Sequence, residues 1–459
     1  MKARRSPPRT KPGKRTPDGK AAGKPKEQQS TKSRGGPAKT AGGKPASKPW
    51  AKPDDKPKAK QDSRPPAKQN ARPAAKPKFA RSALLRLPET LLEDWRETLL
   101  ELAKLPRGVN PKDNTREDLL YAIVKGEARA AHDLWEVFTQ DRGELTRRML
   151  GTKRLAVAYL LGFHLPNAAR AWLGLERAAH RYTLPALFAD PSTRLIWRDL
   201  GCGTGAAAQA VARFALDLGL TQDRLELELF DNTGVLLDAA RALFRHATPS
   251  ARITTYKLPL EALDLARLTK STGDTVTGYS LGYVWNELER NPAARTKLLK
   301  LFENAAAEHS LLLLLEPANQ AIARSTMALR DQLVQLGYTP LYPCPRPTPC
   351  PMLQLSRDWC YSEGEWLRPR EMTLLDRSLG TDRSRLSGGL YVFASASLTA
   401  RLTPSAAHRP VVVGRPERTG APRYGERPFD YLICRGEQLE KRAPVPGKAF
   451  LARGATVSD

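Results

Sequence analysis

Four of the five cysteines lie in the last third of this 459-residue chain, at Cys344, Cys350, Cys360 and Cys434, with the spacing C-x5-C-x9-C-x73-C. Four thiolates can hold either a zinc ion or an iron-sulfur cluster. The paired C-x2-C steps that mark zinc ribbons are absent, whereas Cys-Pro steps, which accompany many cluster ligands, occur twice. The spacing favours a cluster, with zinc and unligated thiols as the alternatives.

The fourth of these cysteines is far from the other three in sequence. If Cys434 shares a metal with them, it ties the C-terminal strands to the cysteine-rich loop, and metal binding then contributes to the free energy of folding. The fifth cysteine, Cys202, lies inside a glycine-rich loop. We interpret it as a small packing residue.

That loop, GCGTG at residues 201–205, follows the strand-like segment LIWRDL and opens an Ala-rich helix. Open α/β sheets bind nucleotide-like ligands at such a loop, because glycines let the backbone approach the ligand. An acid ends the strand before the loop, and a second acid ends the next strand, where it can accept the ribose hydroxyls. The candidate cofactor-binding residues are Asp199, Gly201, Gly203, Gly205 and Asp231.

The glycine pattern lacks the third glycine of the nicotinamide fingerprint and instead resembles motif I of class I methyltransferases. The inferred cofactor is S-adenosylmethionine, with a vestigial pocket as the alternative. No catalytic residue is assigned. The segment after the fourth strand reads YVWNE, with Asn286 and Glu287 but without the prolines that amino-methyltransferases place there. Glu316 also lines the presumed cleft, although a glutamate at this position is as often a cap or loop acceptor.

The elements that must position these residues follow from hydrophobic periodicity. Between 83 and 190 apolar residues recur three and four apart, which predicts helices interrupted at Pro166, with His164 as a core or capping residue. From 194 onward strands and helices alternate, which predicts a parallel, doubly wound sheet. The expected strands are 194–200, 224–231, 251–258, 275–284 and 310–317, and the expected helices are 206–219, 234–246, 292–308 and 320–336.

Composition divides the chain further. The formal net charge is +27, and residues 1–80 contain 24 Lys or Arg against 5 Asp or Glu with almost no apolar residues. Such a segment cannot form a core, so we predict a disordered basic tail that contacts RNA, with a solubilising tail as the alternative. The predicted parts are a tail at 1–80, a helical domain at 81–190, a methyltransferase-like domain at 191–340, and a cysteine-rich and mostly β region at 341–459.

Sequence also bears on the compartment. No apolar run is long enough for a membrane helix, and the Lys/Pro-rich start is unlike a secretory signal or an Arg-rich mitochondrial presequence. We therefore expect a soluble protein of the bacterial cytoplasm, with the mitochondrial matrix as the alternative. In either compartment the clustered cysteines are more plausible as metal ligands than as disulfides.

Several segments together resemble one known family. They are DLGCGTGAA, LGYVWNEL, LLLLLEP, the PCP and DWC cysteine segments, LIC, and the helical AYLLGFHLPNAARA. This combination is similar to methyltransferase-like protein seventeen and its yeast and bacterial relatives, a family of small ribosomal subunit assembly factors. The resemblance covers residues 83–459. Arg346 replaces the histidine that usually follows the first Cys-Pro of the family.

The resemblance implies a class I methyltransferase fold and a 4Fe-4S cluster on Cys344, Cys350, Cys360 and Cys434. It also implies binding to small-subunit ribosomal RNA and ribosomal precursors, without a membrane. We expect a monomeric assembly or translation factor that binds S-adenosylmethionine. The alternative is an active S-adenosylmethionine-dependent rRNA methyltransferase.

Overall fold

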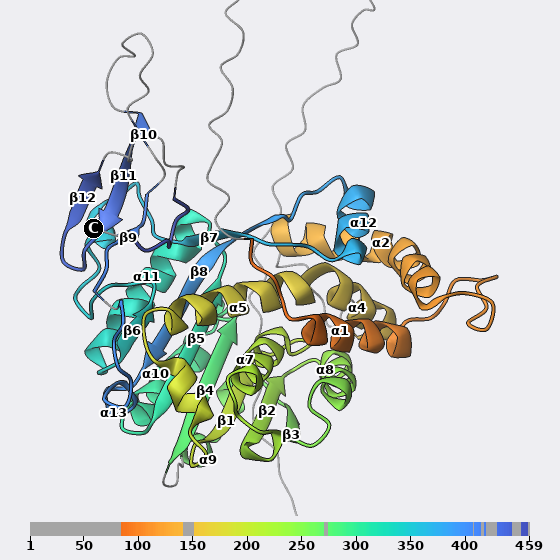
Figure 1. Ribbon diagram of the computed structural model, residues 1–459, viewed down its shortest axis with the longest axis horizontal. Coiled ribbons are helices and arrows are strands. Elements are labelled where there is room, and N and C mark those ends of the chain that lie inside the picture. The colour runs from red at the N-terminus through yellow and green to blue at the C-terminus, as the bar shows by residue number, and fades with distance from the viewer. Residues whose placement is uncertain are drawn as a thin grey trace, which may run out of the picture. The chain divides into compact units, whose positions relative to one another are not determined.

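The protein was analysed as a computed structural model that describes residues 84–140, 151–269, 274–406, 408–414, 417–418, 429–442 and 451–457. The predicted tail at 1–80 lies outside these residues. The larger described sheet has the strand order β3-β2-β1-β4-β5-β8-β6, with β7 paired to β8 (Figure 1). Its strands are β1 Arg194–Leu200, β2 Leu225–Asp231, β3 Arg252–Lys257, β4 Thr275–Gly282, β5 Ser310–Glu316, β6 Thr339–Tyr342, β7 Ser362–Glu365 and β8 Arg385–Ala394.

Strands β1 to β5 are parallel, in the doubly wound order expected of a class I methyltransferase. Each strand and helix predicted from 194 to 336 begins within one residue of the expected position. The sheet is nevertheless mixed, because β8 is antiparallel to both β5 and β6. Strand β8 comes from the predicted 341–459 region and inserts between two strands that precede it in sequence. The predicted α/β fold is confirmed.

The two faces of the sheet bury separate cores. In β5, Leu311, Leu313 and Leu315 belong to one core cluster, whereas Leu312 and Leu314 belong to the other. This alternation follows from the two-residue period of a strand, and it explains why the whole LLLLL run is apolar. Helices α7 (Ala206–Asp217) and α8 (Gly234–Ala247) contribute to the first core, and α10 (Pro292–Ala305) and α11 (Gln320–Gln335) contribute to the second.

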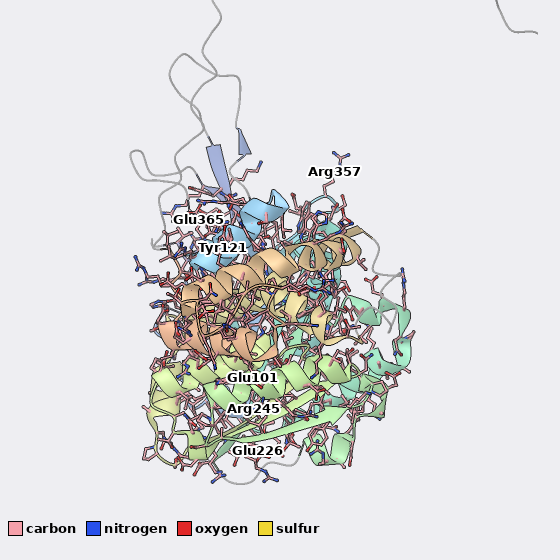
Figure 2. The ribbon with its side chains drawn as sticks, turned by 90° about the vertical axis from the view of Figure 1, so that its right-hand side faces the viewer. Glu101, Tyr121, Glu226, Arg245, Arg357 and Glu365 are labelled. Atoms are coloured by element: carbon pink, nitrogen blue, oxygen red, sulfur yellow. The ribbon has the colours of Figure 1, made fainter. Side chains whose placement is uncertain are left out.

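The N-terminal helices cover the first of these faces. They are α1 Glu89–Leu102, α2 Arg116–Gln140, α4 Lys153–Tyr159, α5 Leu165–Ala179 and α6 Leu184–Ala189. Helix α1 packs on α8, where Arg245 pairs with Glu101, as Figure 2 shows. The prediction of helices in this region is confirmed. The domain boundaries themselves remain predictions.

The break predicted at Pro166 is a π-helical turn, η2 Leu160–His164, which joins α4 to α5 without a gap. Proline has no N–H, so it cannot bond to the carbonyl of Gly162, four residues earlier. Arg383 donates to that carbonyl instead, at 2.6 Å. Trp95 donates to the carbonyl of Leu160 at 3.0 Å. Arg383 therefore satisfies the carbonyl that Pro166 leaves without a helical partner, and Trp95 adds a second long-range hydrogen bond to the turn.

The C-terminal part contains helix α12 (Arg370–Leu379) and a smaller antiparallel sheet. The sheet consists of β9 Val411–Val412, β10 Glu417–Arg418, β11 Phe429–Cys434 and β12 Leu439–Arg442. Strand β11 pairs with the other three. Because Cys434 is the last residue of β11, this sheet fixes the backbone of the most distant cysteine.

Candidate functional site

The GCGTG loop runs from β1 to α7, and all three of its glycines have a positive φ. The φ angles are 73°, 55° and 81° at Gly201, Gly203 and Gly205. A Cβ on Gly201 would lie 2.5 Å from a methyl group of Val284, and a Cβ on Gly205 would lie 2.8 Å from the ring of Phe244. Both positions therefore require glycine for conformation and for space.

The two predicted acids hold this loop from two sides. Asp199 is buried and accepts from the Ser280 hydroxyl at 2.7 Å and from the backbone N–H of Ala208 at 3.2 Å. Asp231 accepts from the N–H of Gly203 at 2.8 Å and from that of Thr233 at 2.7 Å. The structure thus brings all five predicted cofactor-binding residues together.

These acids lie in a poorly solvated and negatively charged setting. Burial, with a contribution from Asp231, raises the pKa of Asp199 to about 6. Burial also raises the pKa of Asp231, although hydrogen bonds from Gly203 and Thr233 oppose the shift. Burial and the charges of Asp231 and Glu287 hold the pKa of Tyr159 far above its usual range. A positively charged ligand would relieve this accumulation of negative charge.

The segment after β4 is fixed by the acid at the end of β5. Glu316 is buried and accepts from the backbone N–H of Trp285 at 2.8 Å and from the side-chain amide of Asn286 at 2.5 Å. That amide also donates to the carbonyl of Tyr283, a non-glycine residue with a φ of 64°. Burial raises the pKa of Glu316 to about 8. Glu316 therefore acts as a loop acceptor, one of the two roles that the sequence left open.

The π turn lies directly against the glycine loop. His164 is buried, with Nδ1 2.8 Å from the hydroxyl of Thr204 and Nε2 2.9 Å from Oε1 of Gln209. Burial lowers the pKa of His164 to about 4, so the ring is neutral at neutral pH. The ring of Tyr159 lies over Gly203, 3.3 to 3.5 Å from where a Cβ would stand. His164 is thus a satisfied core histidine, as expected, and its role is to anchor the loop.

The four late cysteines gather around α11 and the end of β11. Cys350, Cys360 and Cys434 pack in one apolar cluster with Met327 and Met352. Cys344 borders the neighbouring core. Burial and the charges of the other three cysteines hold the pKa of Cys360 far above its usual range. Burial and the charge of Cys344 raise the pKa values of Cys350 to about 12 and of Cys434 to about 11. The four predicted ligands therefore lie within electrostatic reach of one another.

One face of α11 positions the cysteine-rich loop. Arg324 donates to the carbonyls of Leu353, Leu355 and Asp358 at 2.6 to 3.0 Å. The sulfur of Met327 accepts from the N–H of Cys360 at 3.3 Å, and the carboxylate of Asp331 accepts from the N–H of Cys350 at 3.0 Å. These residues recur at helical spacing, so a single rigid element sets the backbone of two of the cysteines.

Several residues at these two sites were not identified from the sequence. They are Tyr159, Arg181, Tyr283, Met327, Arg330 and His408. His408 lies between Cys360 and Cys434 in the chain, and its Nδ1 is 3.3 Å from the carbonyl of Pro345, beside Cys344. Tyr159 and Tyr283 lie within the segments AYLLGFHLPNAARA and LGYVWNEL, which were the signal that could have identified them. The other four residues lie outside the segments named above and reach the cysteine site through long-range packing.

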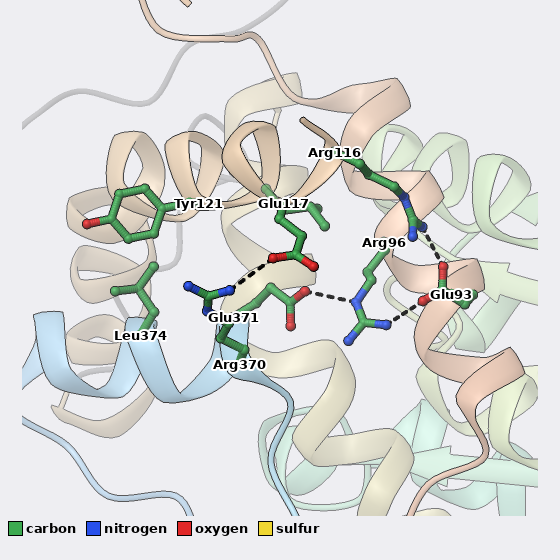
Figure 3. A pocket seen from close by; sticks show the side chains of 9 residues that line it. Glu93, Arg96, Arg116, Glu117, Tyr121, Arg370, Glu371 and Leu374 are labelled. Carbon is green, nitrogen blue, oxygen red and sulfur yellow. Dashed lines mark hydrogen bonds and ion pairs between the residues drawn. The ribbon is translucent and has the colours of Figure 1, made fainter. Parts of the chain in front are cut away.

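Two other features carry no functional assignment. Arginines and glutamates line a hollow of about 250 Å³ between α1, α2 and α12, where they pair with one another, as Arg96 does with Glu371 at 2.8 Å (Figure 3). Among the described residues, one group of three side chains has its possible metal-ligand atoms within 4.8 Å of one another. It consists of His132, Asp133 and Glu136. The two acids of this group are exposed.

A family comparison covers the glycine loop and part of the cysteine site. Residues 199–419 match the family described as mitochondrial small ribosomal subunit Rsm22. This part of the chain is similar to the Rsm22 family. The Rsm22 match contains the glycine loop, Asp231 and three of the four late cysteines, and it confirms the predicted resemblance. A comparison with curated proteins finds no match. No helix in the described ranges is long and apolar enough to cross a membrane.

Three of the similar solved structures are described as methyltransferases or methylases. A Listeria monocytogenes protein assigned to the class I S-adenosylmethionine-dependent methyltransferases is 14% identical, with a TM-score of 0.32, over 67% of this chain and 87% of that chain. A Pyrococcus horikoshii protein assigned as an RNA methyltransferase is 14% identical, with a TM-score of 0.28, over 50% and 83%. An rRNA methylase from Streptococcus thermophilus is 10% identical, with a TM-score of 0.27, over 46% and 93%.

Proposed function

We propose that this protein is an RNA-binding assembly factor of the small ribosomal subunit that binds S-adenosylmethionine and a 4Fe-4S cluster. The cofactor would lie at the glycine loop, and the cluster would lie on Cys344, Cys350, Cys360 and Cys434. One observation carries the proposal. A chain with an Rsm22-family region holds both a complete loop with its two acids and four gathered thiols.

Charge supports S-adenosylmethionine at the loop. The cofactor has a sulfonium and an ammonium group and carries one net positive charge. Asp199, Asp231 and Glu287 act on the same region, and burial raises the pKa values of both aspartates. A cation is the ligand that such a site favours. The product S-adenosylhomocysteine has lost the sulfonium charge and should bind more weakly.

The spacing of the four cysteines supports a cluster over zinc, because the paired C-x2-C steps of a zinc ribbon are absent and Cys-Pro steps occur twice. The surrounding apolar side chains would exclude solvent from the cluster.

The segment after β4 favours an assembly factor over an enzyme. In amino-methyltransferases a side-chain amide at this position holds the target amine. Here the segment YVWNE lacks the prolines of that motif, and the amide nitrogen of Asn286 donates to Tyr283 and Glu316 within the loop. The alternative function, methylation of rRNA, would need another group to position the methyl acceptor.

Cofactor binding can be separated from assembly with Asp231→Ala. Loss of a charge-assisted acceptor for the ribose hydroxyls should weaken S-adenosylmethionine binding by about 1.5 to 3 kcal/mol, or about ten- to a hundredfold. Calorimetry would measure this affinity. For an assembly factor, the variant should still join small-subunit precursors and support their maturation.

The enzyme alternative predicts a different result. Tritium should then pass from labelled S-adenosylmethionine to small-subunit precursors, and maturation should fail in step with cofactor loss while RNA binding persists. If the wild-type protein binds no cofactor, the loop is only a structural turn and the cofactor part of the proposal is wrong.

The basic residues 1–80 provide the test for RNA binding. Deleting them should weaken binding to small-subunit RNA and flatten the dependence of affinity on salt, because fewer counterions are released. An unchanged slope of log K against log salt would show that the segment does not contact RNA. The proposed compartment is the bacterial cytoplasm, with the mitochondrial matrix of the family description as the alternative.

A further inference from the structure

Two buried arginines lie beside the first cysteine of the proposed cluster site. Arg330 of α11 and Arg181, which follows α5, are each 2% exposed. Arg181 donates to the carbonyls of Pro343 and Cys344, at 2.5 and 3.2 Å. Arg330 donates to the carbonyls of Arg346, at 2.8 Å, and of Thr348. Residues 343–348 are thus held from two sides by guanidinium groups.

Burying the two guanidinium charges is unfavourable, which indicates that anionic groups lie close to them. A buried guanidinium needs an anionic partner, because carbonyl dipoles alone do not replace its hydration. Asp331 supplies one carboxylate, 2.6 Å from Arg330. Cys344 interacts electrostatically with both arginines, and Cys434 interacts with Arg181. Both arginines therefore lie beside Cys344, the first cysteine of the site, and Arg181 also lies within electrostatic reach of Cys434, the last.

The charge of a metal centre at this site has the opposite sign. Four thiolates around a core of charge +2 have a net charge of −2, and a reduced iron-sulfur core makes it −3. Burial of such a centre is unfavourable without nearby cations. Net charge and hydrogen bonding also set the reduction potential of iron-sulfur clusters.

We propose that Arg330, which lies across residues 343–348 from Arg181, is a positioning residue. Its positive charge compensates the charge of the four-cysteine centre and raises the reduction potential of that centre. The inference rests on the proposed function, since it requires a cluster on these cysteines. Arg330 acts through Cys344 and the backbone of residues 346–348, and it is not itself a ligand.

Variants of the full-length chain can separate charge from hydrogen bonding. Arg330→Gln keeps hydrogen-bond donors without charge, whereas Arg330→Lys keeps both. Arg324→Gln is the matched control, because Arg324 lies on the same helix and also donates to carbonyls of the cysteine-rich loop. Each protein is purified anaerobically, its iron is counted, and its midpoint potential is measured by reductive titration.

We expect a more negative midpoint potential for Arg330→Gln, and potentials near that of the wild type for Arg330→Lys and Arg324→Gln. Equal potentials for the Gln and Lys variants of Arg330, or an equal shift in Arg324→Gln, would overturn the inference. If Arg330→Gln retains no cluster, Arg181→Gln gives the same test, and an unchanged potential there would overturn it. A wild-type protein without iron would instead refute the proposed cluster itself, together with this inference.

Discussion

The glycine loop and the cysteine site of this protein are built in opposite ways. The loop and its two acids lie between residues 199 and 231, and backbone conformation and neighbouring strands shape them. The cysteine site joins segments up to 90 residues apart and is held by side chains of α11. The buried charged residues nearest the cysteine site are arginines, whereas those nearest the glycine loop are acids. The fold thus separates a site suited to a cation from one suited to an anion.

The largest effect is expected from removing one proposed ligand. Cys360→Ser should lower the iron content from about four per chain, the number in a 4Fe-4S cluster, and should lower the unfolding temperature, because ligand binding is also folding energy. Iron analysis, absorption near 400 nm and thermal unfolding measure these changes. Cys202→Ser is the control, since Cys202 is buried in the glycine loop and lies outside the cysteine site. Equal iron loss in both variants would contradict the assignment.

At the glycine loop, a substitution that disturbs the backbone should lower stability, as the loss of a thiol should at the cysteine site. Gly201→Ala adds a Cβ 2.5 Å from Val284 at a φ of 73°. Left-handed strain and overpacking together should cost about 2 to 5 kcal/mol of unfolding free energy. Gly337→Ala has a φ of 95° but no atom within 4 Å of the new Cβ, so strain alone should cost about 1 to 2 kcal/mol. Chemical denaturation would contradict this account if the two costs were equal.

The raised pKa of Asp199 at the loop site predicts that both stability and cofactor affinity depend on pH. Because the pKa of Asp199 is raised to about 6 in the folded protein, its contribution to stability is present at low pH and is lost as pH rises through about 6. A cationic cofactor favours the ionised form, so its affinity should rise over the same range. The affinity should rise about tenfold for each unit by which the bound cofactor lowers the pKa of Asp199. Calorimetry between pH 5 and about 7.5 measures it.

Asp199→Asn is the matching variant for that measurement. It keeps the shape of the side chain and a carbonyl oxygen that can accept from Ser280, but it cannot ionise. Its affinity for S-adenosylmethionine should therefore show a flatter dependence on pH. A profile as steep as that of the wild type would assign the titration to another group.

The same contrast explains what sequence could predict. Strand and helix periodicity and the glycine motif are local, so the parallel strands and the positions of Asp199 and Asp231 followed from the sequence. The cysteines were found by residue type, but their supports were not, because Arg181 and Pro343 are 162 residues apart. The insertion of β8 was missed for the same reason. An apolar strand indicates burial but does not indicate which neighbour it pairs with.

The smallest effect is expected from Tyr159→Phe, which tests whether carboxylates dominate the loop site. The ring stays packed against Phe163 and Phe138, with centroids 5.2 and 5.9 Å away, so stability should not change. Loss of a neutral hydroxyl over Gly203 should weaken S-adenosylmethionine binding by about 0.5 to 1.5 kcal/mol, or about two- to tenfold.

The dependence of cofactor affinity on pH in Tyr159→Phe separates the contribution of the Tyr159 hydroxyl from that of the carboxylates. The pKa of Tyr159 lies far above its usual range, so this hydroxyl stays protonated throughout the titration of Asp199. The variant should therefore bind more weakly at every pH while its affinity rises with pH as in the wild type. A loss comparable to that of Asp231→Ala would mean that the hydroxyl, rather than the carboxylates, supplies most of the affinity. The cofactor site would then owe less to its negative charge than the comparison with the cysteine site implies.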